Sequence, residues 1–280
     1  MEAKAYGHIL RNKLLFNWTP TLRPLVYRFY RPSEAPVFVL GNQKSGTSAV
    51  AALLARACGL SYDIDLGGLR VPEYARIYAD RGQLPAVFRD RAAIEFSKQL
   101  VKEPNLTFLL SEIQALYPRS RHAFVIRDPR ANIRSICNRL ELPGDLPAIR
   151  PEDYPEISPM WRAILFNEWV GDAARDLNYI GRSAERWRIA ANLCLAAGPA
   201  TQPIRYEDFV TDKLATIHDL SDRLGLEVRH DIVPYLDVQY QQAGKKVTDY
   251  RAFFGEENLT TILTECAETM NALGYQNTRP

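Results

Sequence analysis

The sequence predicts a three-layer α/β/α fold with a central parallel sheet and a largely helical C-terminal half. Short, continuous apolar runs such as Val37–Leu40 and residues 123–126 are typical of strands buried on both faces of a parallel sheet. Helical stretches alternate with these runs, which favours one α/β domain. A chain of 280 residues, 46% hydrophobic and 24% charged, can bury such a core without a disulfide or metal staple.

A basic arm, residues 1–33, precedes the first predicted strand. It holds six basic side chains against one acid, a net charge of +5, whereas the whole chain carries only +2. Pro20 and Pro24 interrupt its apolar and aromatic residues, which predicts two short amphipathic pieces. Two interpretations stay open: peripheral contact with an anionic membrane surface, or packing of the apolar side on the domain. We assign residues 34–280 to a single α/β domain.

The first strand–helix unit begins with Val37–Leu40. A tight loop over residues 41–46 follows, and residues 47–57 have a good helical pattern. Gly59 stands where a glycine commonly ends a helix. The sequence up to the second unit is mostly helical, with one short strand candidate at residues 99–102.

The second unit ends in the predicted strand 123–126. Pro129 suits the first turn of a helix expected over residues 130–140. The proline-rich stretch 142–159 predicts a long loop. The remaining sequence is predominantly helical, with residues 203–206 as one further strand candidate.

Cysteine spacing and hydropathy indicate the compartment. The cysteines form no C-x-x-C pair, which argues against a zinc site or a disulfide framework and favours buried, reduced thiols. These are Cys58, Cys137, Cys194 and Cys266. No apolar run approaches the ~18–20 residues that cross a bilayer, and the N-terminus lacks a signal-peptide pattern. We therefore expect a cytoplasmic protein, membrane-associated only if the arm binds a surface.

The loop after the first strand has the pattern of a phosphate cradle. Residues 41–48 read Gly-Asn-Gln-Lys-Ser-Gly-Thr-Ser between a buried strand and a helix, where backbone N–H groups can surround an anion. The glycine spacing matches the P-loop of nucleotide hydrolases, but Thr47 stands where that motif has its lysine. The cation is instead Lys44, inside the loop. This suits a less charged group than a triphosphate, with no metal required.

This segment resembles the first signature of the sulfotransferases that use 3′-phosphoadenosine-5′-phosphosulfate (PAPS). That signature is a strand, a loop containing K-S/G/A-G-T-T/S, and a helix. Five consecutive residues match it: Lys44, Ser45, Gly46, Thr47 and Ser48. The resemblance implies the P-loop-like sulfotransferase fold, with PAPS as the donor substrate.

A second segment also resembles this family. In the family a strand ends in R-D/N-P, a serine follows eight residues after the arginine, and both hold the donor 3′-phosphate. Arg127 and Ser135 have that spacing. A guanidinium at a strand end can bind phosphate in a bidentate way, and a serine about two helical turns on can reach the same anion. Two signatures in order, about 80 residues apart, make coincidence improbable.

Three weaker resemblances extend along the chain. Lys102, followed by Glu103 and a proline, lies where the family often has K-T-P or K-T-H, which implies that the lysine points at the phosphosulfate bridge. Residues 205–209 resemble an R-Y-E-D-L segment that we interpret as structural. Residues 247–254 resemble G-D-W-K-x-x-F, and Lys245 and Lys246 just upstream are either contacts to the 3′-phosphate or a solvated pair.

The resemblance also implies roles in sulfuryl transfer. Lys44 is expected to meet the bridging oxygen as it takes on charge, while Thr47 and Ser48 hold the non-bridging oxygens. A general base must accept the acceptor proton. We favour Glu103 for this role and then Asp65. Other candidates are Asp63, Glu73 and His122, the last of which is more often a structural residue.

Trp187 is the candidate to stack on the adenine, with a core tryptophan as the alternative. The acceptor is expected to be a hydroxyl, less favourably an amine, of a small molecule, carbohydrate or lipid. No nucleic acid partner is expected, and the sequence leaves the oligomeric state open.

Two other classes of protein compete with this interpretation. A P-loop kinase or nucleotide hydrolase would share the glycine spacing, but the lysine after Gly46 is missing and no acidic metal-binding residue ends a buried strand convincingly. A non-catalytic phosphonucleotide-binding module would keep the cradle and bind the donor without transfer.

Overall fold

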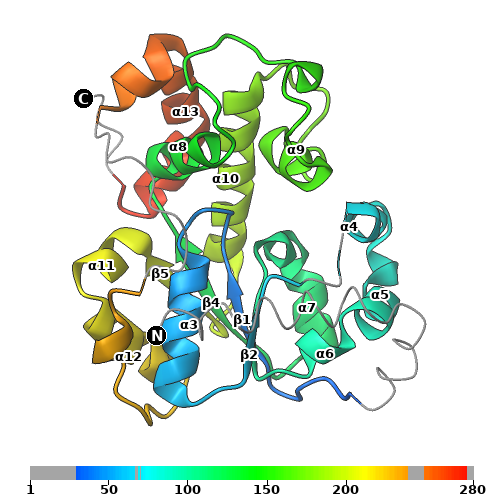
Figure 1. The fold of residues 1–280 in the computed structure, drawn as a ribbon, viewed down its shortest axis with the longest axis vertical. Helices are drawn as coiled ribbons and strands as arrows, with labels where there is room; N and C mark the ends of the chain where they lie inside the picture. Colours follow the sequence, from blue (N-terminus) through cyan, green and yellow to red (C-terminus); the bar gives the residue numbers. More distant parts are fainter. Residues whose placement is uncertain (1–29, 67–68, 70, 239–248, 276–280) are drawn as a thin grey trace.

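A computed structural model describes residues 30–66, 69, 71–238 and 249–275 (Figure 1). Its centre is a parallel sheet in the order β2-β3-β1-β4-β5. The strands are β1 (Val37–Leu40), β2 (Tyr62–Ile64), β3 (Leu100–Lys102), β4 (Arg121–Ile126) and β5 (Thr201–Arg205). The predicted fold class is confirmed.

Alternating side chains of β1 explain the three layers. Phe38 and Leu40 face one apolar cluster and Val37 and Val39 face another, because successive side chains of a strand point to opposite faces. One face is covered mainly by α3 (Thr47–Cys58), α11 (Tyr206–Thr211) and α12 (Lys213–Arg223). The other face carries the larger cluster, to which α4 to α10 (residues 71–196) and α13 (Tyr250–Ala272) contribute.

The remaining helices fall into two groups in Figure 1. Between β2 and β4 the chain forms α4 (Val71–Ala79), η1 (Arg81–Gln83), α5 (Leu84–Arg91), α6 (Ala93–Phe96), η2 (Pro104–Leu109) and α7 (Leu110–Leu116). After β4 it forms α8 (Pro129–Arg139), η3 (Pro151–Asp153), α9 (Pro159–Leu165), α10 (Tyr179–Ala196) and α13 (Tyr250–Ala272). The short turn η4 (Val233–Tyr235) lies instead beside α3, where Tyr235 packs against Arg56. The helical C-terminal half is confirmed.

The strand β2 is the one strand in the described chain that the sequence did not indicate. It has three residues, the middle one is Asp63, and it lies at the sheet edge against β3. Its hydrogen bonds come from tertiary pairing with β3, so its own sequence carries little strand signal. This strand nevertheless positions Asp65 beside the end of β3.

The predictions about thiols and loops also have outcomes in the structure. All four cysteines are free and buried, as expected. The stretch before α9 is a loop apart from one short 3-10 turn, η3, which confirms the predicted long connection. Within the described residues, no helix combines the length and apolar character needed to span a bilayer. Residues 1–29 of the predicted basic arm lie outside the described residues.

Candidate active site

Several of the predicted site residues lie at the carboxyl edge of the sheet. The loop 41–46 follows β1, Glu103 follows β3, and Arg127 follows β4. After β1 the chain forms β2 and β3 on one side of β1, and it then crosses to form β4 on the other side. The loops that follow β1 and β4 therefore border a topological switch point. Parallel α/β sheets bind their ligands at such a point, outside the strand ends.

The loop after β1 is tightly constrained by its backbone. Gly41 has φ 135°, and a side chain there would meet the Val125 carbonyl oxygen at 2.3 Å. Lys44 takes the left-handed conformation with φ 65°. Gly46, with φ 95°, precedes the first residue of α3, whose N-terminal N–H groups face the loop. The loop therefore has the backbone geometry that suits an anion at this helix N-terminus.

Helix α8 holds this loop from the side. The Asn132 side-chain amide donates to the Gln43 carbonyl oxygen at 2.8 Å and to Ser45 Oγ at 3.0 Å. Its Oδ1 accepts a hydrogen bond from the Asn42 amide at 2.9 Å. Because all these side chains are buried, the hydrogen bonds fix the loop relative to the second motif. Asn132 lies inside that motif, but its role was not predicted.

The two sequence motifs contact each other directly at Arg127. Its Nη1 donates to the Lys44 carbonyl oxygen at 2.9 Å, and its guanidinium lies 4.5 Å from the ring centroid of Tyr206. Asp128 does not pair with Arg127: it caps α8 and forms an ion pair with Arg130 at 2.5 Å. The Arg127 guanidinium is thus held by a carbonyl and a ring, with no ion pair to a carboxylate among the described residues.

The residues of this corner fit an anionic group. Arg127 Nε and Arg134 Nη1 are buried and have no hydrogen-bond acceptor within the described part of the chain. Buried donors of charged groups are costly when unpaired, so a phosphate or sulfate oxygen would satisfy them. Ser135, half-buried on α8, directly follows Arg134. Lys245 and Lys246 lie outside the described residues, and their predicted contact stays a prediction.

Lys44 has a strongly cationic environment. Burial lowers the pKa of its ammonium group, and the positive charges of Arg139, Arg127 and Lys102 lower it further. A bound anion would reverse this effect, since an opposite charge favours the protonated amine. Arg139 was not predicted. It ends α8, and its guanidinium lies 5.9 Å from the Trp161 ring centroid.

The two favoured base candidates lie next to Lys102 at the ends of β2 and β3. The side chain of Lys102 is 3% exposed, and its ammonium group forms an ion pair with Asp65, whose side chain is 66% exposed. Glu103 is buried, and its carboxylate accepts from the backbone N–H groups of Leu66 at 3.1 Å and Asn105 at 2.9 Å. Burial raises the pKa of Glu103, and the nearby charge of Asp65 raises it further. Both carboxylates therefore lie at the ends of adjacent strands.

The other base candidates lie in different environments. Asp63 is buried within β2, and Glu73 is in the first turn of α4. His122 is fully buried in β4, between Ser120 Oγ at 3.0 Å and Thr201 Oγ1 at 3.1 Å. Burial lowers the pKa of His122 to about 4, so its imidazole is neutral at pH 7. These contacts support a structural role for His122.

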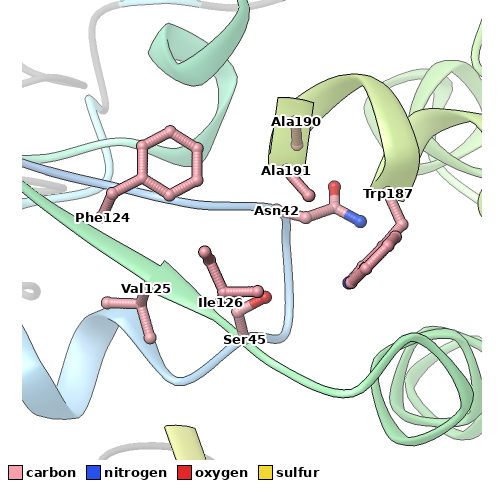
Figure 2. A pocket seen from close by; sticks show the side chains of 8 residues that line it. All are labelled: Asn42, Ser45, Phe124, Val125, Ile126, Trp187, Ala190 and Ala191. Atoms are coloured by element: carbon pink, nitrogen blue, oxygen red, sulfur yellow. The ribbon is translucent and has the colours of Figure 1, made fainter. Parts of the chain in front are cut away.

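Trp187 is buried in the core next to Arg127. Its indole N–H donates to the Arg127 carbonyl oxygen at 2.8 Å, and the residue is 1% exposed. Figure 2 shows Trp187 beside Asn42 and Ser45, around a cavity of about 10 Å³, far too small for a purine. This burial favours the core-tryptophan alternative over adenine stacking. The Trp187 hydrogen bond holds the backbone of Arg127 in place.

Gly46 offers a direct test of the loop geometry. A Cβ at Gly46 would lie 2.3 Å from the Tyr206 ring, which also packs under Arg127. We expect Gly46→Ala to lower the free energy of unfolding by about 2–4 kcal/mol, because the added methyl combines backbone strain with overpacking. Urea denaturation measures this change. Gly198→Ala is the control, since nothing lies within 4 Å of a Cβ there; equal effects at both positions would contradict the close packing.

The fold and the site together define a class: a P-loop-like α/β protein whose loop after β1 suits an anionic group and lacks the usual P-loop lysine. The chain belongs to the sulfotransferase family, because the sequence model of that family matches residues 61–231, more than half of the chain. The match begins after the loop 41–46, which supports the family independently of the first motif. The protein is therefore a transferase of the sulfotransferase family. No curated protein matches the chain.

Solved structures of sulfotransferases share the fold. One is the sulfotransferase from Alicyclobacillus acidocaldarius, with TM-score 0.50, 16% identity, and coverage of 88% of this chain and 97% of that one. Another is sulfotransferase STF1 from Mycobacterium tuberculosis, with TM-score 0.51, 16% identity and coverage of 85% and 78%. Mouse sulfotransferase SULT7A1, solved in complex with PAP (adenosine 3′,5′-bisphosphate), has TM-score 0.51, 11% identity and coverage of 91% of each chain.

Proposed function

We propose that this protein transfers the sulfuryl group of PAPS to a hydroxyl group of a small-molecule, carbohydrate or lipid acceptor. One observation carries the proposal: Arg127 donates to the Lys44 carbonyl oxygen at 2.9 Å, which joins the two phosphate-binding motifs at one edge of the sheet. The PAP complex of the mouse neighbour supports the same donor. When bound, PAPS supplies an activated sulfuryl group.

The chain's own residues divide this work. Lys44 provides a cation, with Thr47, Ser48 and the first N–H groups of α3 as further donors to anionic oxygens. Arg127, Arg134 and Ser135 supply donors suited to a phosphate. These groups would orient the donor substrate and hold its charge. They need no metal ion for that task, because the protein's own cations neutralise the anion.

Glu103 is our assignment for the general base. Burial raises the pKa of Glu103 toward neutral pH, and a carboxylate with such a pKa is a more effective base for taking a proton from a hydroxyl. Lys102 and Asp65, paired beside it, hold the ends of β3 and β2 together. Asp65 is the alternative base because its carboxylate is far more exposed than that of Glu103.

Substitution of the two carboxylates separates these assignments. We expect Glu103→Gln to lower kcat by about 10²–10⁴-fold, and Asp65→Asn to lower it much less. Because the pKa of Glu103 is raised, activity falls as the pH drops toward that pKa, and the Glu103→Gln profile lacks this acid limb. The pH dependence of initial rates measures both effects. The opposite ranking, with the acid limb lost in Asp65→Asn, would assign the base to Asp65.

A transfer assay tests the proposed function. Acceptor extracts incubated with radiolabelled PAPS and the protein are expected to yield a labelled product, with formation of adenosine 3′,5′-bisphosphate (PAP). Lys44→Ala serves as the catalytically impaired control. Donor binding without labelling of any acceptor in a broad panel would favour a binding module, and magnesium-dependent ATP turnover would favour a kinase or hydrolase.

A further inference from the structure

Arg186 is a buried cation whose polar contacts in the described part of the chain are to neutral side chains. The whole residue is 0% exposed, in the middle of α10. Within the described residues it forms no ion pair with a carboxylate, and its guanidinium lies 4.1 Å from the Phe108 ring centroid. Burial lowers the pKa of Arg186 to about 10, so it stays charged at neutral pH. Such a charge is expensive to keep in a protein interior.

The guanidinium contacts three amide side chains from three separate segments. Its Nε and Nη2 each lie 3.3 Å from Oε1 of Gln43 in the loop after β1. Nη2 lies 3.5 Å from Oδ1 of Asn105 in η2, and Nη1 lies 3.4 Å from Oδ1 of Asn167 after α9. Arg186 thus connects the loop that carries Lys44 to the segment that carries Glu103.

Two of these amide side chains, Gln43 and Asn105, also bond directly to each other. Gln43 Nε2 donates to Asn105 Oδ1 at 2.7 Å, and the backbone N–H of Asn105 donates to Glu103 at 2.9 Å. All of these residues are buried. These hydrogen bonds, through Asn105, therefore join the loop 41–46 to Glu103, the proposed base.

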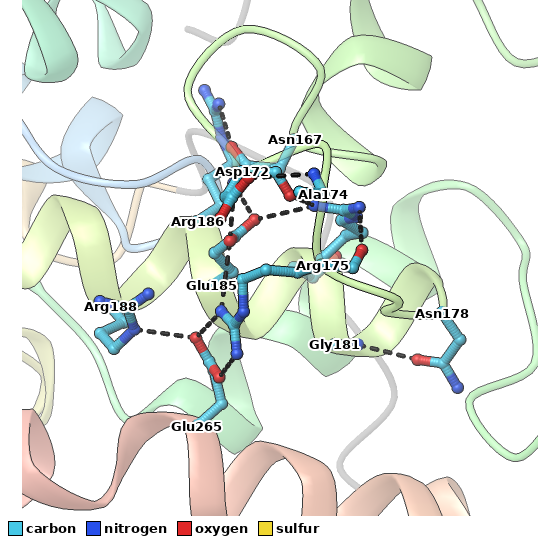
Figure 3. Close-up of polar contacts among 12 residues, drawn as sticks. Asn167, Asp172, Ala174, Arg175, Asn178, Gly181, Glu185, Arg186, Arg188 and Glu265 are labelled. Atoms are coloured by element: carbon cyan, nitrogen blue, oxygen red, sulfur yellow. Dashed lines mark hydrogen bonds and ion pairs between the residues drawn. The ribbon is translucent and has the colours of Figure 1, made fainter.

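The nearest carboxylate on the same helix is already shared among other groups. Figure 3 shows Asn167 between Arg186 and Glu185. Asn167 donates to Glu185 at 2.9 Å, and Glu185 forms ion pairs with Arg175 at 3.2 Å and Arg182 at 3.4 Å. Arg175 in turn pairs with Glu265 of α13 at 2.6 Å. Neutral amides therefore carry the polar contacts of Arg186.

These contacts are poorly explained by stability alone. Distances of 3.3–3.5 Å are long for hydrogen bonds, and apolar side chains of similar volume would avoid the cost of burying the charge. What the guanidinium does uniquely is present several fixed donors to three segments at once. We propose that Arg186 is a positioning residue. It holds Gln43 and Asn105, and so keeps the loop 41–46 and the segment 103–105 in a fixed position relative to each other. This inference rests on the proposed function.

Binding of PAP provides the first test. We expect Arg186→Met to weaken PAP binding about tenfold in calorimetry, and Gln43→Ala to do the same, because each disconnects the loop from α10. The double variant should be no weaker than either single variant. Arg188→Met is the matched control on the same helix, since Arg188 bonds to Glu265 and not to the loop. Unchanged PAP binding in Arg186→Met, or effects of the two substitutions that add in full, would overturn the proposal.

Thermal unfolding provides a second test that does not depend on the donor. Asn105→Asp keeps the acceptor oxygen and loses one weak contact to Met160 Sδ at 3.6 Å, while it gives Arg186 a counterion. We expect Asn105→Asp to raise the unfolding midpoint of the wild type and to lower that of Arg186→Met. The two shifts should differ by about 5 °C. The same change in both backgrounds would overturn the role of the charge.

These tests keep the two proposals apart. If the wild type does not bind PAP, the proposed function fails, while the unfolding measurements still report on Arg186. If the wild type binds PAP but Arg186→Met binds equally well, only the positioning role fails. Should Arg186→Met not fold, Arg186→Lys replaces it, because lysine keeps the charge but cannot contact three segments at once.

Discussion

Replacing Lys44 with alanine is expected to lower kcat by about 10²–10³-fold while leaving the dissociation constant of PAP within a few-fold of the wild type. Lys44 lies in the loop between β1 and α3, and its backbone already accepts a hydrogen bond from Arg127. Alanine keeps that carbonyl, so the phosphate-binding groups stay in place. The lost cation acts on charge that develops in the transition state, and PAP lacks the sulfuryl group.

Rate assays with saturating PAPS, combined with calorimetry of PAP, separate these effects. Arg119→Ala is the control for net charge, since the Arg119 side chain is 73% exposed. Because the pKa of Lys44 is lowered below its usual 10.5, kcat/KM should fall as the pH rises through that lowered pKa, and this alkaline limb should be absent in Lys44→Ala. Equal losses in PAP binding and in turnover would contradict the assignment.

Replacing Arg127 with alanine is expected to weaken PAP binding at least about 10²-fold, equivalent to about 3 kcal/mol. This side chain donates to the Lys44 carbonyl oxygen, packs on Tyr206 and keeps a buried Nε that has no acceptor among the residues the structure describes. Its removal therefore takes away a hydrogen-bond donor to the phosphate and a contact that holds the loop 41–46 in place. The loop contact also stabilises the apo protein, so we expect a lower unfolding midpoint without ligand.

Arg127→Lys is the matched variant for this experiment. Lysine restores the charge, but it cannot donate from a planar fork to the carbonyl and an anion together. We expect only partial recovery of PAP binding in calorimetry. Full recovery would show that charge alone suffices, and unchanged binding in Arg127→Ala would remove Arg127 from the site.

Local sequence was sufficient to predict the parts of the site that follow buried strands. Lys44 stands in the loop after one apolar run and Arg127 directly after another, and parallel strands bring their carboxyl ends to one edge. The contact between Lys44 and Arg127 follows from that geometry. Asp65 was foreseen as a candidate although β2 was not, because the strand depends on pairing with β3.

Residues that act through tertiary contacts could not be predicted in the same way. Tyr206, in a segment interpreted as structural, packs under Arg127. Arg186 is one helical residue among several arginines of α10, and its burial against Gln43 and Asn105 depends on how α10 crosses the loop. Trp187 shows the converse: an aromatic residue suggested a ligand contact, but it packs into the core and bonds to Arg127.

Titration calorimetry with PAP, adenosine 5′-monophosphate and Mg-ATP tests the central claim most directly. The arrangement of Lys44, Arg127 and Ser135 predicts that PAP binds with one molecule per chain and more tightly than either other nucleotide, because only PAP carries the 3′-phosphate. Arg127→Ala should abolish most of that preference. Absent PAP binding, or a preference for Mg-ATP, would contradict the assignment of PAPS as the donor.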